Sequence, residues 1–133
     1  MQALTDAIYT KYNGSSALKA VLTQGLWLSE APENQAFPYG VFFIVSDVPE
    51  YTFNEAMENI LVQFTLFSNT QSAVASGGID AIYTQLITLF DWCSLSVTGW
   101  TFIYMKRESS HSERIDDVWH YWVTYRILLW KTQ

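Results

Sequence analysis

The chain has 133 residues, of which 50% are hydrophobic, 17% aromatic and 15% charged, and its formal net charge is −6. This length corresponds to one domain on the usual ~100–200 residues per domain, and a single cysteine, Cys93, excludes an intramolecular disulfide framework. No apolar run reaches the ~18–20 residues of a membrane span, and the first residues do not resemble a signal peptide. The sequence therefore predicts one soluble domain over residues 1–133, with no membrane partner.

Aromatic side chains are abundant relative to charged ones. Six Trp, eight Tyr and eight Phe accompany a charged fraction well below the ~25% that is typical of globular domains. A single interior of this size has too little room for so many rings, and large exposed apolar patches mark interfaces. We therefore expect another chain to cover part of the aromatic surface.

Charge is distributed unevenly along the chain. No Lys or Arg lies between Lys19 and Lys106. Eight acidic residues occupy that stretch: Glu30, Glu33, Asp47, Glu50, Glu55, Glu58, Asp80 and Asp91. Binding to a phosphate backbone requires clustered Lys and Arg, so the sequence argues against a sequence-reading DNA-binding role. An acidic surface would instead suit a passage through which nucleic acid slides without sticking.

The first part of the chain predicts two helical segments and a short strand. Leu4, Ile8 and Tyr12 recur at helical spacing, and an Asn-Gly pair then ends that helix. A second helical turn is expected at 17–22 and a short strand at 25–29, followed by a polar loop.

The middle of the chain predicts a hairpin and a helix. Two aromatic and β-branched runs, 41–45 and 60–67, are expected to pair as antiparallel strands with a long connecting loop over 46–58. Residues 79–90 carry an apolar stripe at spacings of three and four, which is the clearest helix pattern in the chain. The glycine pair at 77–78 predicts an irregular start to this helix.

Two further strands are expected at the C-terminal end, at 95–105 with Gly99 as a bulge or bend, and at 118–131. The polar, Ser-rich linker 106–117 between them predicts a mobile hairpin tip. Odd positions of the last strand predict a core-facing row: Tyr121, Val123, Tyr125, Ile127 and Leu129. Even positions form the opposite row: His120, Trp122, Thr124, Arg126, Leu128 and Trp130. Because a strand that is apolar on both faces is covered on both, a helix of the same chain or a neighbouring subunit is expected over the even row.

The order of these segments predicts the fold class. Helix, short strand, hairpin, helix and hairpin follow one another, with no internal repeat. This order predicts an α+β domain with a mostly antiparallel, mixed β-sheet of four to five strands and helices packed on one face.

Residues with catalytic potential are scarce. Cys93 ends an apolar helix stripe, so a buried inert thiol is favoured over a nucleophile. His111 and His120 lie near several carboxylates, but their spacing matches no established ligand pattern, so a polar loop is favoured over a metal site. Neither a P-loop nor a dinucleotide fingerprint is present. The sequence predicts a protein that is not an enzyme and takes no metal or cofactor.

Several short segments carry a resemblance to a known family. In chain order they are the Leu4, Ile8 and Tyr12 helix face, Ala31-Pro32 after the short strand, Phe37-Pro38-Tyr39-Gly40-Val41-Phe42, Val62-Gln63-Phe64, the helix through Leu89, and Arg114-Ile115-Asp116-Asp117 before the last strand. Their ordered combination resembles the phage tail-completion family, which comprises tail terminators and head–tail joining proteins. The resemblance covers nearly the whole chain, although each motif is short.

The resemblance implies a structural virion protein in the tail or neck, assembled in the bacterial host cytoplasm. Family members form rings, commonly hexameric, that end tail-tube polymerisation and join the tail to the head. The implied partners are further copies of the chain, the major tail-tube protein and the head connector or neck protein, with DNA only as passing cargo.

Two sets of residues are candidates for contacts in such a ring. Trp122, Leu128 and Trp130, with Arg126 in the same row, are candidates for the subunit interface. Candidates for docking loops are Glu50 and Glu55 in 46–58, and Lys106, Arg107, Arg114, Asp116 and Asp117 in 106–117.

Two other functions remain open at this point. One is a small monomeric binding module whose aromatic sheet face holds a peptide or an apolar ligand. The other is a hydrolase that uses Cys93 as its nucleophile.

Overall fold

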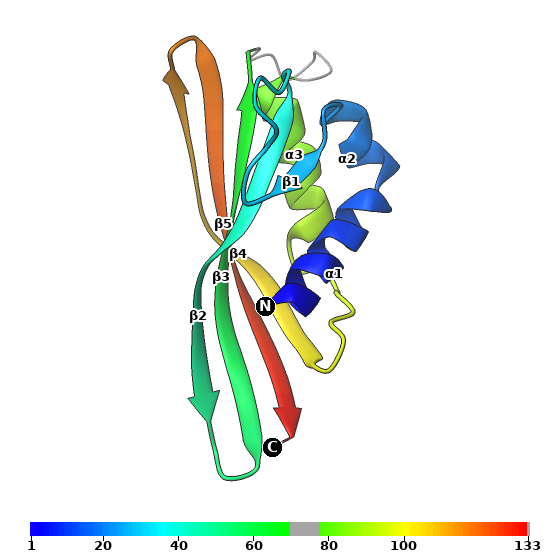
Figure 1. Cartoon of the computed structure of the whole chain (residues 1–133), viewed down its shortest axis with the longest axis vertical. Helices are drawn as coiled ribbons and strands as arrows, with labels where there is room; N and C mark the ends of the chain where they lie inside the picture. The colour runs from blue at the N-terminus through cyan, green and yellow to red at the C-terminus, as the bar shows by residue number, and fades with distance from the viewer. Residues whose placement is uncertain (70–77, 133) are drawn as a thin grey trace.

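The computed structural model describes residues 1–69 and 78–132 and shows a five-stranded mixed sheet with three helices, which confirms the predicted α+β class (Figure 1). The elements in chain order are α1 (Gln2–Asn13), α2 (Ser16–Val21), β1 (Leu26–Leu28), β2 (Tyr39–Tyr51), β3 (Glu55–Ser68), α3 (Ile79–Phe90), β4 (Thr101–Ile115) and β5 (Val118–Thr132). Among the described residues, no helix is both long and apolar enough to cross a membrane.

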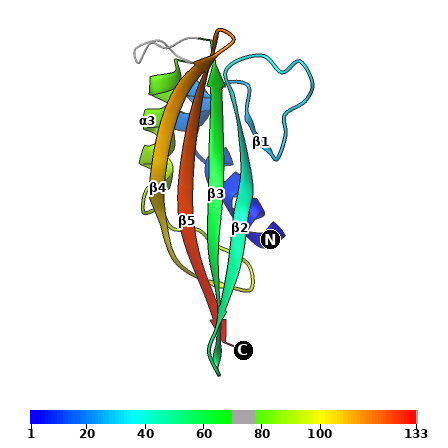
Figure 2. The same cartoon turned by 90° about the vertical axis from the view of Figure 1, so that its left-hand side faces the viewer.

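The strand order across the sheet is β1-β2-β3-β5-β4. The short strand β1 pairs in parallel with β2, and all other neighbouring strands are antiparallel. The helices cover one face of the sheet, and no described helix lies on the opposite face (Figure 2). The four long strands extend beyond the helices, so that the β2–β3 and β4–β5 hairpins project at opposite ends of the molecule (Figure 1).

The core lies between the helices and the covered face of the sheet. Phe64 of β3 packs against Phe90 of α3 with ring centroids 4.9 Å apart, and against Tyr125 of β5 at 5.7 Å. The predicted helix stripes are buried as expected, because α1 inserts Leu4, Ile8 and Tyr12 and α3 inserts its apolar residues. The odd row of β5 also faces this core.

The segment 46–58, predicted as a long loop, is instead the outer half of the β2–β3 hairpin. Strand pairing continues to Tyr51 opposite Ala56, and residues 52–54 connect the two strands. The Thr52 amide donates to the Glu55 carbonyl over 2.9 Å and closes this turn. The prediction was wrong because this half of the hairpin extends past the helices. Of residues 46–58 only Ala56 is buried, so the apolar alternation that reveals a strand is absent.

The segment 106–117, predicted as a mobile tip, is also mostly strand. β4 continues to Ile115 and β5 begins at Val118, so the turn consists only of Asp116 and Asp117, with φ values of 50° and 65°. Two successive positive φ values are typical of a type I′ hairpin turn. The polar sequence that suggested a loop belongs to an edge strand, where charged residues prevent unwanted pairing.

The start of β4 also differs from the prediction. Residues 95–100 form a connection that buries Leu95 and Val97, and Gly99 lies in a turn before the strand with φ +86°. The bulges of β4 lie further on, between Phe102 and Tyr104 and between Arg107 and Ser109. Of the glycine pair, Gly77 lies outside the described residues, whereas Gly78 is the N-cap of a regular α3.

Candidate functional site

The face of the sheet opposite the helices, which we call the open face, is the main candidate for a functional surface. Cross-strand register places Val41, Thr65, Trp122 and His111 in one row across β2, β3, β5 and β4. Other members of the open face are Tyr39, Phe43, Phe67, His120, Thr124, Arg126, Leu128 and Trp130. No described helix lies over this face in Figure 2, so none covers the even row of β5.

Aromatic rings contact one another in sequence across the upper half of the open face. These rings form an aromatic ladder, in the order Phe37, Tyr39, Phe67, His120, Trp122 and His111. The centroids of successive rings lie 5.7, 4.8, 4.8, 5.5 and 5.4 Å apart. These separations lie within the ~4.5–7 Å range of favourable ring pairs. A groove of about 540 Å³ separates the ladder from the loop that follows β1.

A polar cluster divides the aromatic ladder from the lower part of the open face. The Arg126 guanidinium donates to Glu108 over 2.6 Å and also to the side-chain oxygen of Asn59. Lys106 lies 4.0 Å from the same Glu108 carboxylate. These contacts balance the charge of Arg126 within its own chain.

The predicted interface residues Trp122, Arg126, Leu128 and Trp130 thus lie on one surface. All four are half-buried, and the alternation of the strand pleat directs them away from the core. The sequence predicted that either a helix of the same chain or a neighbouring subunit covers this row. The described residues place no helix on this face. The apolar members of the row are therefore available to another molecule.

The predicted docking residues separate into different places. Glu50 and Glu55 lie in the strands of the β2–β3 hairpin, while Arg114, Asp116 and Asp117 lie at the end of the β4–β5 hairpin, at the opposite end of the molecule (Figure 1). Arg114 forms an ion pair with Asp117 over 3.1 Å and stabilises the turn.

Arg107 connects β4 to the helix layer. Its guanidinium lies 3.4 Å from the Asp91 carboxylate after α3 and donates to the Tyr83 hydroxyl of that helix. The Tyr125 hydroxyl donates to the same Asp91 over 2.5 Å. Burial, followed by the hydrogen bond to Asp91, raises the pKa of Tyr125, so this phenol stays protonated. The contacts of Arg107 are those of a residue that holds the fold together.

The β2–β3 hairpin combines acidic side chains with exposed aromatic rings. Asp47, Glu50, Glu55 and Glu58 all lie on this hairpin. A hydrogen bond with Asp47, assisted by burial and by repulsion from the same carboxyl, raises the pKa of Glu58 to about 7. Phe53 in the turn is fully exposed. Sequence reasoning missed Phe53 because it assigned the whole segment to a loop.

Cys93, His111 and His120 are the side chains that the sequence raised as candidates for catalysis or metal binding. Cys93 is half-buried, its Sγ lies 3.6 Å from Met105 Sδ, and burial raises the pKa of its thiol. His111 Nε2 lies 4.0 Å from Glu113, and His120 Nδ1 lies 3.1 Å from the Val118 carbonyl. The described residues contain no group of three or more His, Cys, Asp or Glu side chains that could hold a metal ion.

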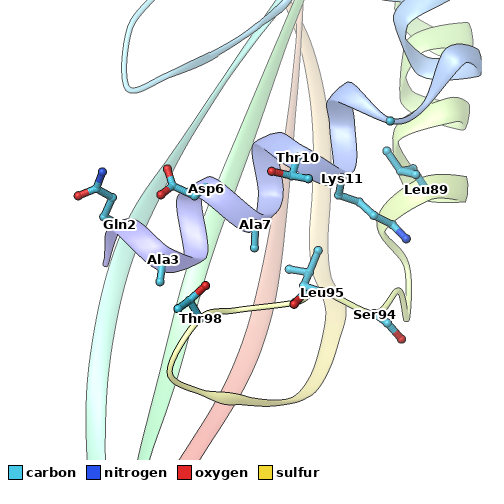
Figure 3. Close-up of a pocket in the computed structure, with 12 residues that line it drawn as sticks. Gln2, Ala3, Asp6, Ala7, Thr10, Lys11, Leu89, Ser94, Leu95 and Thr98 are labelled. Carbon is cyan, nitrogen blue, oxygen red and sulfur yellow. The ribbon is translucent and has the colours of Figure 1, made fainter.

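A second concave surface lies on the helix side of the molecule. A groove of about 850 Å³ runs between α1 and the segment 94–98 (Figure 3). Small side chains such as Ala3, Ala7 and Thr98 line it, and Lys11 extends from α1 beside Leu89 and Ser94 (Figure 3). None of the residues predicted for interfaces or docking lies in this groove.

Comparison with known proteins shows a shared fold. A chain from a solved structure described as the virion of a native gene transfer agent particle matches with a TM-score of 0.74 and 12% identity, over 98% of this chain and 96% of that chain. A second solved chain matches with a TM-score of 0.57 and 11% identity, over 99% of this chain and 94% of its own length. No protein-family model matches the sequence, and a search of curated proteins finds no match. This α+β fold therefore also occurs, nearly end to end, in a virion particle.

Proposed function

We propose that the chain is a structural subunit of a phage-like virion. It forms a ring at the head-proximal end of the tail, ends tail-tube polymerisation and joins the tail to the head around a central DNA passage. The observation that carries the proposal is the aromatic open face, which no described helix covers. The shared fold with a chain of a gene transfer agent virion supports the same conclusion.

The open face is the surface that assembly buries in this proposal. Trp122, Leu128 and Trp130 are large apolar side chains on a rigid strand, and aromatic anchors dominate the energy of protein interfaces. A ring forms when each subunit presents one patch to its neighbour and a different patch to the next. The family resemblance leads us to expect six copies, with the major tail-tube protein on one side of the ring and the head connector on the other.

The acidic β2–β3 hairpin is assigned to the DNA passage. It carries Asp47, Glu50, Glu55 and Glu58, and no Lys or Arg lies within its strands. Negative side chains do not bind a phosphate backbone, so DNA passes through without being retained. The protein acts by contact and shape, and the proposal includes no catalytic step and no cofactor.

Substitution of the open-face tryptophans tests this proposal. We expect Trp122→Ala and Trp130→Ala to fold but to lose ring formation and production of infectious particles. Tyr9→Ala is the matched control because Tyr9 is an aromatic on α1 with an exposed fraction of 48%. If both tryptophan variants assemble and support infection as well as the control does, the open face is not the assembly surface.

A monomeric binding module is the second candidate function. The groove beside the aromatic ladder has a volume of about 540 Å³, within the ~300–1,000 Å³ range of ligand pockets. Light scattering separates the two functions, because this module stays monomeric at micromolar concentration whereas the ring subunit assembles.

A further inference from the structure

The two outer edges of the sheet are protected against strand-to-strand pairing. The β4 edge has two bulges and carries Lys106 and Arg107. Beyond β1, the β2 edge has a bulge between Ile44 and Ser46 and then Pro49. Bulges, charges and proline on an edge are typical means of preventing backbone pairing between molecules. A contact between the edges of two subunits therefore has to be made by side chains.

The β4 edge carries a protruding indole ring. Trp92 follows α3, and its amide donates to the Met105 carbonyl of β4 over 2.9 Å, which fixes the residue against the edge strand. Its ring meets Tyr104 edge to face at 6.2 Å and is 70% exposed. Trp92 has a φ of +53°, a backbone conformation that bulky residues rarely adopt. A tryptophan held in this conformation with its ring in solvent is a candidate anchor for another molecule.

The β2 edge carries a groove of suitable size for such a ring. Its volume is about 710 Å³, and its apolar lining comes from Met1, Leu28, Phe43 and Ile44. Leu28 is 50% exposed, and the neighbouring Val45 is similarly exposed. The β2 edge and the chain start lie on one side of the sheet and β4 on the other (Figure 2). The indole and the groove therefore cannot meet within one molecule.

The groove side of the sheet carries acidic side chains, whereas the β4 edge carries Lys106 and Arg107 beside their partners Glu108 and Asp91. Asp6 lines the groove, and Asp47 and Glu50 continue along β2. On the opposite edge, Lys106 lies over the ring of Tyr104, which itself contacts Trp92. Complementary charge around an apolar contact favours one partner and one register.

We infer that Trp92 of one copy inserts into the β2-edge groove of a second copy of the same chain. The contact joins different patches on opposite edges, so each subunit presents one of each, and such head-to-tail contacts form a ring when the rotation between neighbours closes. This inference rests on the proposed ring and adds a contact between the sheet edges to the open-face contact of neighbouring subunits.

Thiol cross-linking tests the contact directly. In a Cys93→Ser background, Ile103→Cys places a thiol on the β4 edge and Val45→Cys places one beside the groove, while Trp92 and the groove lining stay intact. With a short bismaleimide, we expect a ladder of linked species up to the ring size only when one chain carries both cysteines. Each single-cysteine chain is expected to remain unlinked.

Complementation of two defective variants provides a second test. Trp92→Ala keeps the groove but lacks the indole, and Leu28→Arg keeps the indole of Trp92 but fills the groove. Each variant alone is expected to associate at least about 30-fold more weakly than the natural chain, as is typical of an interface anchor. An equimolar mixture is expected to form heterodimers, because one intact contact remains. Phe53→Ala, which removes a fully exposed ring from the hairpin turn, is the matched control and is expected to assemble normally.

The outcomes separate this inference from the proposed function. Rings that form without any cross-linked ladder, or a mixture that yields no heterodimer, would overturn the Trp92 contact alone. Linked dimers from Ile103→Cys alone would show a symmetric contact and would also overturn it. A natural chain that remains monomeric at every concentration would overturn the ring itself.

Discussion

At the scale of single residues, Gly40 shows how tightly β1, β2 and β3 pack beneath α2. A Cβ atom at this position would lie 3.0 Å from Leu26 Cδ1 and 3.1 Å from Leu66 Cδ2, and both leucines are buried. Gly40→Ala is therefore expected to reduce the free energy of unfolding by about 1–3 kcal/mol, as overpacking of a core does. Urea unfolding measures this difference.

Gly14 provides the control for this substitution. Its φ is −83°, and an added Cβ would meet only backbone oxygens at 3.6 and 3.8 Å. Gly14→Ala is expected to leave stability unchanged or to raise it by up to about 1 kcal/mol, because alanine restricts the unfolded chain. Equal losses from both substitutions would contradict the packing described at Gly40.

The hydrogen bond from Tyr125 to Asp91 joins the sheet to the end of α3. Tyr125→Phe removes this 2.5 Å bond from a carboxylate that also pairs with Arg107. We expect a loss of about 1.5–3 kcal/mol, which is typical of a hydrogen bond to a charged group. Tyr104→Phe is the control, since the Tyr104 hydroxyl makes no hydrogen bond to the described residues, and chemical denaturation compares the two. A similar stability for both variants would show that the bond contributes little.

At the scale of elements, the β2–β3 hairpin is predicted to respond to pH through Glu58. Its pKa is raised from 4.5 to about 7, so the folded chain holds the Glu58 proton more tightly than the unfolded chain does. This contribution to stability is fully present below pH 4.5 and is lost as the pH rises to about 7. Glu58→Gln is expected to raise the thermal midpoint relative to the natural chain above pH 7 and to change it little below pH 4.5.

Thermal unfolding across this pH range measures the effect, with Glu50→Gln on the same hairpin as the control. Asp47→Asn is expected to reproduce the gain at neutral pH, since it removes the repelling carboxyl. A Glu58→Gln effect that is constant across the pH range would mean that the two carboxyls do not share a proton.

Elements were predictable from the sequence where a core covers one face. The odd row of β5 and the apolar stripe of α3 alternate clearly because one side of each element is buried. The outer parts of β2 and β4 are exposed and lack an alternating row of core-facing residues, so their sequences look like loops. The structure of these outer parts is determined by pairing with a neighbouring strand. The residues of one strand alone do not reveal this pairing.

At the scale of the whole molecule, the sequence identified part of the candidate surface. The even row of β5 could be found because two tryptophans alternate with core residues along one strand. The edge contact could not be predicted from the sequence. Only the strand order shows that the Trp92 ring and the groove near Met1 and Leu28 lie on opposite sides of the sheet. Arg107 was predicted in a loop but lies in β4, and its contact with Asp91 could not be predicted because Asp91 comes from another element.

Removal of the acidic charge is predicted to affect DNA contact. A variant carrying Glu50→Gln and Glu55→Gln is expected to bind DNA more tightly at low salt than the natural chain, because two of the charges assigned to the passage are lost. Ring formation should be unaffected. Electrophoretic mobility shift at two salt concentrations measures the change, and an unchanged mobility at low salt would contradict the placement of this hairpin at the passage.

The mass and shape of the purified chain test whether it closes into a ring. We predict that mass photometry at increasing concentration reaches a single assembled mass, and that electron microscopy of that species shows closed rings with a central channel. A chain that remains monomeric throughout, or that grows into open filaments of unlimited length, would contradict the account.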